Sequence, residues 1–424
     1  MRIRHACAAL GRWAAWGLAL LVAGAAASAL AAPITLAESL AAARDNLEVI
    51  IATRSRAAAQ ADIVAADHAP LPQLSAKLSQ IDLQNGIGPG NLVTGKRIDK
   101  GVGLDWTWER GDKRALRTEA ARRNAAAAAA DLVEVRTQQL LAAQAAFFDL
   151  FAAQGRVEQL MAIEQSTQQT AQTAGLRLRA GDIALQDAER AAIEAERVRA
   201  DTESARLEVR RAQLVLAQLT GRDRDADALR AQDPGPPGAA PDAALPLTPL
   251  VEQRGDVRAA TERVRAAESA LGGAAALRHS DITWGGSLDH YPGTSTRQLE
   301  LRLSMPLAFG YRYEGETGRA AAQLEQARDA LEKVRRSAAT ELQRLRAEAS
   351  SAAQRDGRYQ HEIVPRSRQV AERAELAYSK GALSLTELLD ARRTLRAVLL
   401  ESLAARNDLA KAVAAWQLRS ATPP

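Results

Sequence analysis

The chain has few of the residues on which redox and metal chemistry depend. Of its 424 residues only Cys7 is a cysteine, and the five histidines stand far apart, at positions 5, 68, 279, 290 and 361. This spacing is not that of a metal site, and a lone cysteine cannot form an internal disulfide. No nucleotide-binding or nucleophile motif occurs in a strand–turn–helix setting. We therefore expect no catalysis, no cofactor and no metal site.

Aromatic residues and long apolar runs are also scarce. Aromatics make up 4% of the chain, although apolar residues make up 47%, much of it alanine. Alanine-rich segments suit long helices that pack closely, whereas a compact enzyme core usually contains more Phe, Tyr and Ile. No run of eighteen apolar residues follows the N-terminus, so we expect no transmembrane helix in the mature chain.

The N-terminus has the three parts of a secretory signal peptide. Three arginines, at positions 2, 4 and 12, precede the apolar residues 13–27, and Ala29-Leu30-Ala31 is an A-x-A cleavage site. We therefore predict that 1–31 is a signal peptide. Cys7 lies within it, so no acylated cysteine is expected on the mature chain. Losing the three arginines lowers the formal net charge from +5 to +2, which does not indicate nucleic acid as a partner.

A motif occurs twice in the chain at a step of 200 residues. Each copy has a long, charged, alanine-rich segment that reaches a glycine, passes a short polar turn and resumes a helical pattern. The corresponding residues are Gly181, Leu185, Asp187 and Ala191, and Gly381, Leu385, Glu387 and Ala391. Because glycine often ends a helix in a left-handed conformation, each copy is predicted to be the tip of a helical hairpin. We predict two structural repeats, 32–221 and 249–424, with tips near 175–185 and 378–385 and a Pro/Gly-rich linker at 222–248.

Each repeat also contains a pair of segments in which apolar and polar residues alternate. The pair lies within about 73–109 in the first repeat and within about 280–307 in the second. Alternation around a loop predicts a β-hairpin with one apolar face. Each strand has about ten residues, which is the length of a tilted strand that crosses a bilayer. Seven aromatics lie in or beside these hairpins: Trp106, Trp108, Trp284, Tyr291, Phe309, Tyr311 and Tyr313. Aromatics gather in this way at membrane interfaces, although the strand pattern is equally consistent with hairpins on a soluble core.

Long helical segments surround the hairpins. We predict helices at 36–67, 117–174, 185–219, 318–377 and 385–418, with a kink at Pro365. Four strands cannot span a membrane alone, because their open edges would face lipid. A membrane barrel would therefore need strands from several chains.

The layout resembles that of the outer-membrane efflux protein (TolC-like) family, over essentially the whole mature chain. Three motifs carry the resemblance: Arg254-Gly-Asp-Val257-Arg-Ala-Ala, which has Gly255 where the family has proline; Tyr378-x-x-Gly381 with Leu388-Leu-Asp-Ala391; and Leu219-Thr-Gly221. The resemblance implies a mostly α fold with a transmembrane β-barrel. Three chains would form a twelve-stranded barrel in the outer membrane of a Gram-negative bacterium and a long helical tunnel in the periplasm.

The same resemblance implies a function and partners. Such a protein is a passive exit duct of a tripartite efflux or type I secretion system. Its partners would be a periplasmic adaptor (membrane fusion) protein, an inner-membrane pump of the RND or ABC type, and outer-membrane lipid. The segments 280–288, Asp289-His-Tyr-Pro-Gly and Ser304-Met-Pro-Leu307 resemble members that serve heavy-metal pumps. Whether the pump exports metal ions, drugs or proteins stays open.

The resemblance also assigns roles at the second tip. Glu387 and Asp390 match an acidic entrance ring, Asp187 is the first-repeat match to Glu387, and Tyr378 matches a gating tyrosine. At Leu383 some members have a basic residue that locks the closed tip. Charged residues on long helices more often form a solvated face, which is the alternative for these acids. Two other classes remain open, a periplasmic adaptor and a structural coiled-coil protein of the envelope, although neither requires two bilayer-length strand pairs.

Overall fold

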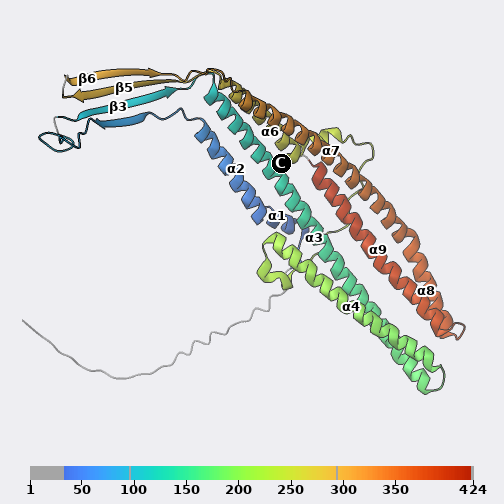
Figure 1. Ribbon diagram of the computed structural model, residues 1–424. Helices are drawn as coiled ribbons and strands as arrows, with labels where there is room; N and C mark the ends of the chain where they lie inside the picture. The colour runs from blue at the N-terminus through green and yellow to red at the C-terminus, as the bar shows by residue number, and fades with distance from the viewer. Residues whose placement is uncertain (1–32, 95–96, 293–294, 422–424) are drawn as a thin grey trace, which may run out of the picture.

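Long helices, a four-stranded sheet and a short parallel strand pair make up the chain in a computed structural model that describes residues 33–94, 97–292 and 295–421. The sheet stands at one end, and the helices run from it to the two hairpin tips at the other end (Figure 1). The predicted signal peptide, 1–31, lies outside the described residues. None of the described helices is both long enough and apolar enough to serve as a membrane span.

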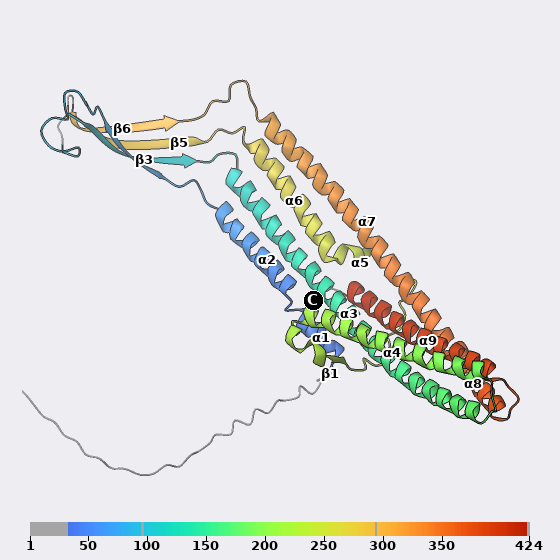
Figure 2. The ribbon, with the colours of Figure 1, turned by 60° about the horizontal axis from the view of Figure 1, so that its bottom comes forward.

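The two repeats contain similar series of elements. The first has β1 (Pro33–Ile34), α1 (Leu36–Ala43), α2 (Leu47–Ala66), β2 (Gln73–Ser79), β3 (Asp99–Trp108), α3 (Lys113–Arg179) and α4 (Leu185–Thr220). The second has α5 (Thr248–Gln253), α6 (Gly255–Ala276), β5 (Ile282–Tyr291), β6 (Ser295–Ser304), α7 (Glu314–Arg358), α8 (Val364–Ser379) and α9 (Leu385–Ser420). In each repeat a shorter helix, α2 or α6, precedes a strand pair and a hairpin of long helices (Figure 2).

The strands form a four-stranded antiparallel sheet in the order β2-β3-β5-β6. The two predicted hairpins are therefore joined along β3 and β5, which pair from Lys100 opposite His290 to Trp108 opposite Ile282. β2 and β6 are the outer strands of the sheet. A separate parallel pair is formed by β1 and β4 (Arg230–Ala231).

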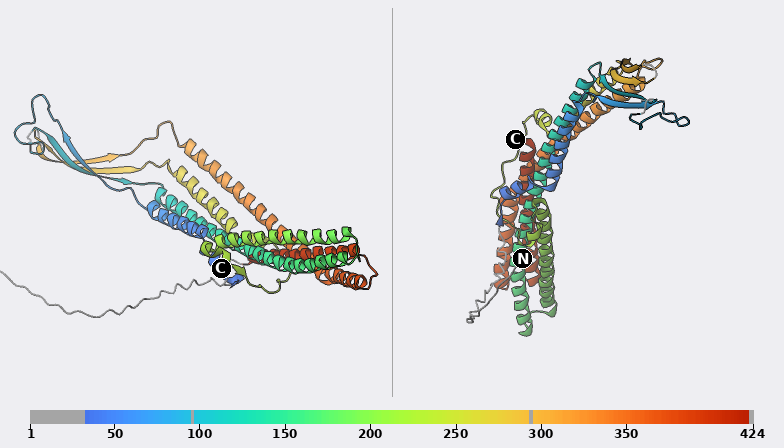
Figure 3. Two further views of the ribbon diagram at one scale, coloured as in Figure 1. Left: turned by 90° about the horizontal axis from the view of Figure 1, so that it is seen from below. Right: turned by 90° about the vertical axis from the view of Figure 1, so that its left-hand side faces the viewer.

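Both long helices begin from a residue with left-handed backbone. Asp112 precedes α3 at φ 57°, and Tyr313 precedes α7 at φ 59°. Residues with a side chain adopt this conformation uncommonly, so its occurrence at the same place in both repeats reflects the duplication. The chain thereby changes direction between sheet and helix, and the sheet is inclined to the helical bundle (Figure 3).

Three segments are more finely divided than the sequence pattern predicts. The helix expected at 36–67 is interrupted, because the Asn46 side chain accepts a hydrogen bond from Glu48 N and caps α2. The kink expected at Pro365 is preceded by a π-helical turn, η2 (Tyr359–Ile363). A π-turn inserts an extra residue into a helix. The start of the predicted linker contains a 3-10 turn, η1 (Asp223–Ala228), and β4.

The best-buried part of the chain is where the first repeat's helices cross the start of that linker. Phe147 and Leu150 of α3 and Leu216 of α4 are fully buried there, and they pack with Ile34 of β1 and Leu229 beside β4. Burial of these apolar side chains holds α3 and α4 together near the middle of the molecule. A second cluster, described below, joins the two tips.

Candidate functional site

The two hairpin tips have the same backbone geometry. Gly181 follows α3 with φ +83°, and Gly381 follows α8 with φ +75°. In the first tip the N–H of Gly181 donates to Leu178 O (3.0 Å), and Asp182 N donates to Arg177 O (2.9 Å). Gly381 and Ala382 repeat these bonds in the second tip at 3.0 and 2.9 Å. This pair of bonds is the Schellman motif, in which glycine provides the left-handed residue that ends a helix.

The tips pack against each other at one end of the molecule. Their contact has an apolar core of small side chains and leucines, made of Ala174, Ala188, Ala191, Leu385, Leu388 and Leu389. Two polar contacts lie beside this core. Arg177 Nη1 donates to the Tyr378 hydroxyl (2.8 Å), and Arg190 Nη1 donates to Thr386 Oγ1 (3.0 Å). The two repeats are thus connected at their tips as well as in the sheet.

Tyr378, the predicted gating residue, lies at this contact. Its side chain is half-buried, and its ring packs against the cluster that joins the tips. The Arg177 guanidinium stands 5.5 Å from the ring centre, close enough for a cation–π interaction in addition to the hydrogen bond. A displacement of one tip relative to the other would break these contacts.

The three predicted entrance acids have different surroundings. Glu387 belongs to a capping box: its Oε2 accepts from Ser384 N (2.9 Å) and Ser384 Oγ (2.7 Å), and Glu387 N donates to Ser384 Oγ (3.3 Å). These hydrogen bonds lower the pKa of Glu387. Asp390, one turn later, is exposed, and its carboxylate forms no ion pair within the described residues. Asp187 is half-buried in the first turn of α4, 3.9 Å from Arg190.

Sequence reasoning missed a buried ion cluster further along the same helices. The side chain of Glu194 in α4 is only 4% exposed and lies between two arginines of α9. Its carboxylate is 2.9 Å from Arg393 Nη2 and 3.1 Å from Arg396 Nη1. The sequence does contain an indication of this cluster, because Glu194 stands on the buried stripe of α4 between Ala191 and Val198. An acid at such a position requires a partner from the facing helix.

A second buried cluster connects α3, α7 and the C-terminal end of α9 to Arg254, the residue between α5 and α6. Glu341 of α7 accepts from Arg254 Nη2 (2.9 Å) and from Arg419 Nε (3.0 Å). Arg419 also holds Glu134 of α3 at 2.8 Å. Burial alone would lower the pKa of Arg254, but hydrogen bonds and charges from Asp256 and Glu341 raise it. In the sequence motif at 254–257, Arg254 and Asp256 therefore serve to hold the helices together.

The close contact of α6 with α3 also explains Gly255 in that motif. A Cβ at Gly255 would be 2.8 Å from both Ala130 O and Glu134 N of α3. Such distances are too short for a carbon atom. Glycine therefore allows the start of α6 to approach the backbone of the long helix.

One face of the sheet is apolar and exposed over its whole width. Trp106 stands opposite Trp284, and Leu301 and Leu104 lie on either side of Gly286. The exposed apolar residues of the sheet are Leu74, Leu78, Val102, Leu104, Trp106, Trp108, Trp284, Leu288, Leu299, Leu301 and Leu303. Tyr291, the last residue of β5, is half-buried. A contiguous apolar face of this kind is rare on a monomeric soluble protein and marks a membrane or protein contact.

The opposite face of the sheet is polar and is covered by charged side chains that cross small residues. Arg302 of β6 donates to Asp105 of β3 (3.0 Å) across Gly285, where a Cβ would be 2.2 Å from the Asp105 carboxylate. Thr107 and Thr283 share a hydrogen bond of 2.9 Å. Alternation of an apolar and a polar face is the pattern of membrane barrel strands.

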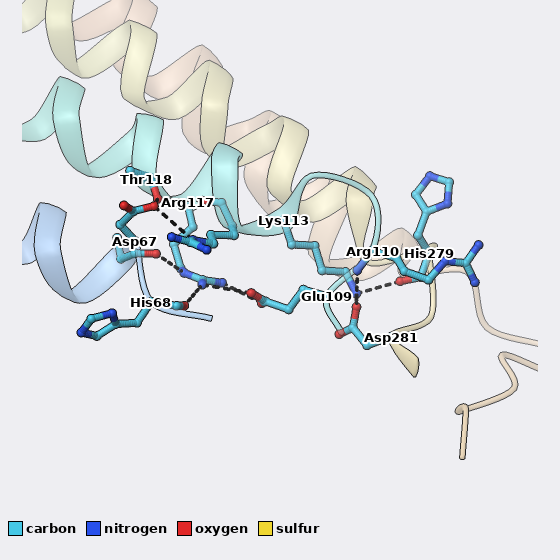
Figure 4. A network of polar contacts seen from close by, with 11 residues as sticks. Asp67, His68, Glu109, Arg110, Lys113, Arg117, Thr118, His279 and Asp281 are labelled. Carbon is cyan, nitrogen blue, oxygen red and sulfur yellow. Dashed lines mark hydrogen bonds and ion pairs between the residues drawn. The ribbon is translucent and has the colours of Figure 1, made fainter. Parts of the chain in front are cut away.

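Polar contacts fix the junction between the sheet and the helices (Figure 4). Lys113, at the start of α3, donates to His279 O and Asp281 Oδ1, both at 2.7 Å. Arg117 donates to Glu109 (2.9 Å) and to the carbonyl oxygen of His68 (2.8 Å). These contacts hold the ends of β3 and α2 and the approach to β5 around the first turns of α3.

Comparison with known proteins gives this geometry a context. Residues 248–422, which include α5 to α9 of the second repeat, match the family model "Outer membrane efflux protein". The chain carries an outer membrane efflux protein domain. The resemblance inferred from the sequence is thereby confirmed. No curated protein matches the chain.

Solved structures share the fold of this outer membrane efflux protein domain and of the first repeat. A membrane protein from Pseudomonas aeruginosa is 19% identical with a TM-score of 0.78, over 91% of this chain and 93% of that chain. The outer-membrane channel OprN is 21% identical with a TM-score of 0.76, over 92% and 91%. The CmeC outer membrane channel of Campylobacter jejuni is 15% identical with a TM-score of 0.76, over 91% and 85%. The mostly helical fold predicted from the sequence is confirmed by these matches.

Proposed function

We propose that the chain is the outer-membrane channel of a tripartite efflux or type I secretion system. The observation that carries the proposal is the sheet: one mainly apolar face, one polar face, and two outer strands with edges unpaired in the described residues. A lipid-facing sheet must close, because backbone groups at an open edge have no partner in hydrocarbon. The family match and the shared fold support this assignment.

A homotrimer provides the closure. β6 of one copy would pair with β2 of the next, and three four-stranded sheets would form a twelve-stranded barrel. The apolar face with Trp106, Trp108 and Trp284 would then contact lipid, with Tyr291 at an interface. The polar face, with Asp105 and Arg302, would line a water-filled lumen. No lipid anchor is required for this attachment.

The helices would extend from the barrel through the periplasm. The two tips would then be the entrance, where a periplasmic adaptor protein docks and presents substrate from an inner-membrane pump of the RND or ABC type. Substrate would move passively, and the chain would perform no chemistry. Whether the cargo is a metal ion, a drug or a protein is decided by the pump.

Within this channel the acids of the second tip have separate roles. Asp390, exposed and without an ion pair in the described residues, would form the acidic ring at the constriction. Glu387 would contribute to the same field but mainly caps α9, and Asp187 lies beside Arg190. Tyr378 would act as the gate, because its contact with Arg177 joins the two tips.

Two measurements on the full mature chain test the proposal. Cell fractionation should place the protein in the outer membrane, and the purified trimer should convert to monomer when a detergent sample is boiled before electrophoresis. The same trimer should form conducting pores in a planar bilayer. Protein that fractionates with the inner membrane, or a stable monomer with its full β content in detergent, would contradict the proposal and favour an adaptor or structural coiled coil.

A further inference from the structure

Three exposed arginines stand at the junction of sheet and helices without an ion pair in the described part of the chain. Arg110 follows β3, Arg278 follows α6, and Arg312 precedes α7. The three come from segments far apart in sequence and meet where the strands turn into helices (Figure 4 shows Arg110).

Two neighbouring cations of α3 are held by acids. Lys113 contacts Asp281 at 2.7 Å and Arg117 contacts Glu109 at 2.9 Å. The Arg110 guanidinium, by contrast, has Met305 Sδ as its contact, at 4.0 Å. A sulfur atom at that distance provides no compensating charge.

Arg278 and Arg312 lie close to each other and share one nearby acid. Arg278 Nε donates to the carbonyl oxygen of Arg312 (3.3 Å). Backbone hydrogen bonds lower the pKa of Glu314, and the positive charges of Arg278 and Arg312 lower it further. The Glu314 carboxylate accepts from the Arg312 backbone N–H (2.9 Å), and the nearby Glu316 is bound by the Tyr311 hydroxyl. This pair of arginines keeps an excess of positive charge.

The arginines begin where the apolar face of the sheet ends. Trp108 is the last residue of β3 and is 60% exposed, and Arg110 is two residues away. On the second repeat, Leu307 (62% exposed) and Phe309 (85% exposed) precede Arg312. An apolar face followed by aromatic residues and then by arginines matches the order of hydrocarbon, interface and phosphate in a lipid leaflet.

We propose that Arg110, Arg278 and Arg312 bind the phosphate groups of phospholipids in the leaflet nearer the helices. The inference rests on the proposed function, because it requires the sheet to lie in a membrane. Guanidinium binds phosphate through two parallel N–H donors, which makes arginine better suited to this contact than lysine. In a trimer the three arginines repeat around the barrel as a collar that fixes its depth in the bilayer.

Anionic lipid headgroups are the occupant that the charges favour. A partner protein would have to present acids at the level of the aromatic side chains, whereas the lipid leaflet presents phosphates there all around the barrel. A Lys or Arg near an anionic lipid surface strengthens the attraction about fivefold. The collar should therefore prefer phosphatidylglycerol to zwitterionic phosphatidylcholine.

Tryptophan fluorescence of the full mature trimer in vesicles tests this preference. Trp106, Trp108 and Trp284 are exposed on the apolar face, whereas Trp416 is buried, so the first three report on neighbouring lipid. Brominated phosphatidylglycerol and brominated phosphatidylcholine are each mixed into phosphatidylcholine vesicles at the same fraction. We expect stronger quenching by brominated phosphatidylglycerol, with a relative affinity at least about fivefold higher.

Arginine variants test whether these three residues cause the preference for phosphatidylglycerol. In the combined Arg110→Gln, Arg278→Gln and Arg312→Gln variant, the relative affinity should fall to about one. The matched control replaces Arg206, Arg368 and Arg373 by Gln; these are exposed residues of α4 and α8 without ion pairs in the described residues, far from the sheet. The control should keep the wild-type preference. An unchanged preference in the first variant, or an equal loss in both, overturns the inference.

Two further arms separate the alternatives. Inorganic phosphate at a few millimolar, compared with chloride at the same ionic strength, should leave the preference for phosphatidylglycerol unchanged. If inorganic phosphate removes the preference and chloride does not, the arginines bind a free anion, which overturns the lipid assignment. Pore conductance is recorded from the same preparations. If the wild-type protein forms pores but shows no lipid preference, only the arginine collar is refuted. If the wild-type protein forms no pores, the proposed function is refuted as well.

Discussion

Glu387 accepts two hydrogen bonds from Ser384, at 2.9 Å from the backbone nitrogen and 2.7 Å from the hydroxyl. The sequence pattern places Glu387 and Asp390 on one helix face, and the family resemblance assigns both to an acidic entrance ring. Their side chains are not equivalent in the structure, because the Glu387 carboxylate caps α9 while the Asp390 carboxylate is exposed without an ion pair in the described residues.

The first prediction concerns ion passage through the proposed entrance. Wild-type pores should be cation-selective and partly blocked by multivalent cations from the tip side, because three carboxylates per ring position attract cations. Asp390→Asn should reduce this block more than Glu387→Gln, and the double Ala variant should abolish it. Single-channel conductance in a planar bilayer measures the effect. Block and selectivity that survive the double substitution at unchanged trimer yield would place the constriction elsewhere.

The second prediction concerns the pH dependence of the tip. The pKa of Glu387 is below its ordinary value of 4.5 because of the hydrogen bonds from Ser384. An acid whose folded pKa is lowered stabilises the fold above its unfolded pKa, and this stabilisation is lost as the pH falls through the folded pKa. Wild type should therefore exceed Glu387→Gln in stability at pH 7, and the difference should shrink below about pH 4.5. Hydrogen exchange of the first amides of α9 measures it, and a pH-independent difference would contradict the role of the charge.

A companion substitution separates the cap from the charge. Ser384→Ala removes the N-cap oxygen and should destabilise the start of α9 by about 1 kcal/mol. Its effect should be largely independent of pH from 5 to 8, because serine does not titrate. The equivalent residue of the first tip, Ala184, forms no side-chain cap, so the first tip is the internal reference for amide exchange.

The duplication made much of the fold predictable from the sequence. The glycines at 181 and 381 have positive φ as the turn pattern requires, and α4 and α9 begin at Leu185 and Leu385, where the helical pattern resumes. Alternation likewise located the four strands. These features depend on local residue patterns, which a sequence contains directly.

Other features depend on contacts between distant segments, which a single sequence does not specify. The pairing of β3 with β5 joins residues about 180 positions apart, such as Trp106 and Trp284. The ion pairs of Glu194 likewise require the facing helix α9, and the π-turn before Pro365 contacts that helix through the Tyr359 hydroxyl, which donates to Glu401. The capping box of Glu387 was readable, since Ser-x-x-Glu at 384–387 is its pattern.

The third prediction concerns the buried acid of α4. Glu194→Ala removes the carboxylate shared by Arg393, which is 47% exposed, and Arg396, which is only 15% exposed and would be left as a mostly buried unpaired charge. Breaking a buried ion pair in this way should cost about 3 kcal/mol of unfolding free energy. Glu196→Ala, a matched change on the exposed side of α4 where the acid is 76% exposed, should change it by less than about 1 kcal/mol. Denaturant unfolding of the detergent-solubilised protein compares the two.

The same variant should also affect the pore. Glu194 links α4 to α9 a few turns from the tips, so its loss should loosen the second hairpin relative to the first and raise the fraction of time that the pore conducts. Glu196→Ala should leave that fraction unchanged. An equal change in stability for the two variants would show that the buried contact contributes no more than a surface pair.

The last prediction concerns the two faces of β6. Leu301 is 81% exposed on the apolar face, whereas Glu300, its neighbour, points to the polar face opposite Ser287. An arginine at a lipid-facing mid-membrane position costs about 2–4 kcal/mol, because the charge must leave water. Leu301→Arg should therefore lower the yield of heat-modifiable trimer in the outer membrane. Glu300→Gln should leave that yield unchanged and alter only ion selectivity, because a lumen-facing side chain stays in water. Equal losses of trimer from the two substitutions would mean that neither face contacts lipid, and the sheet would then have to pack on protein instead.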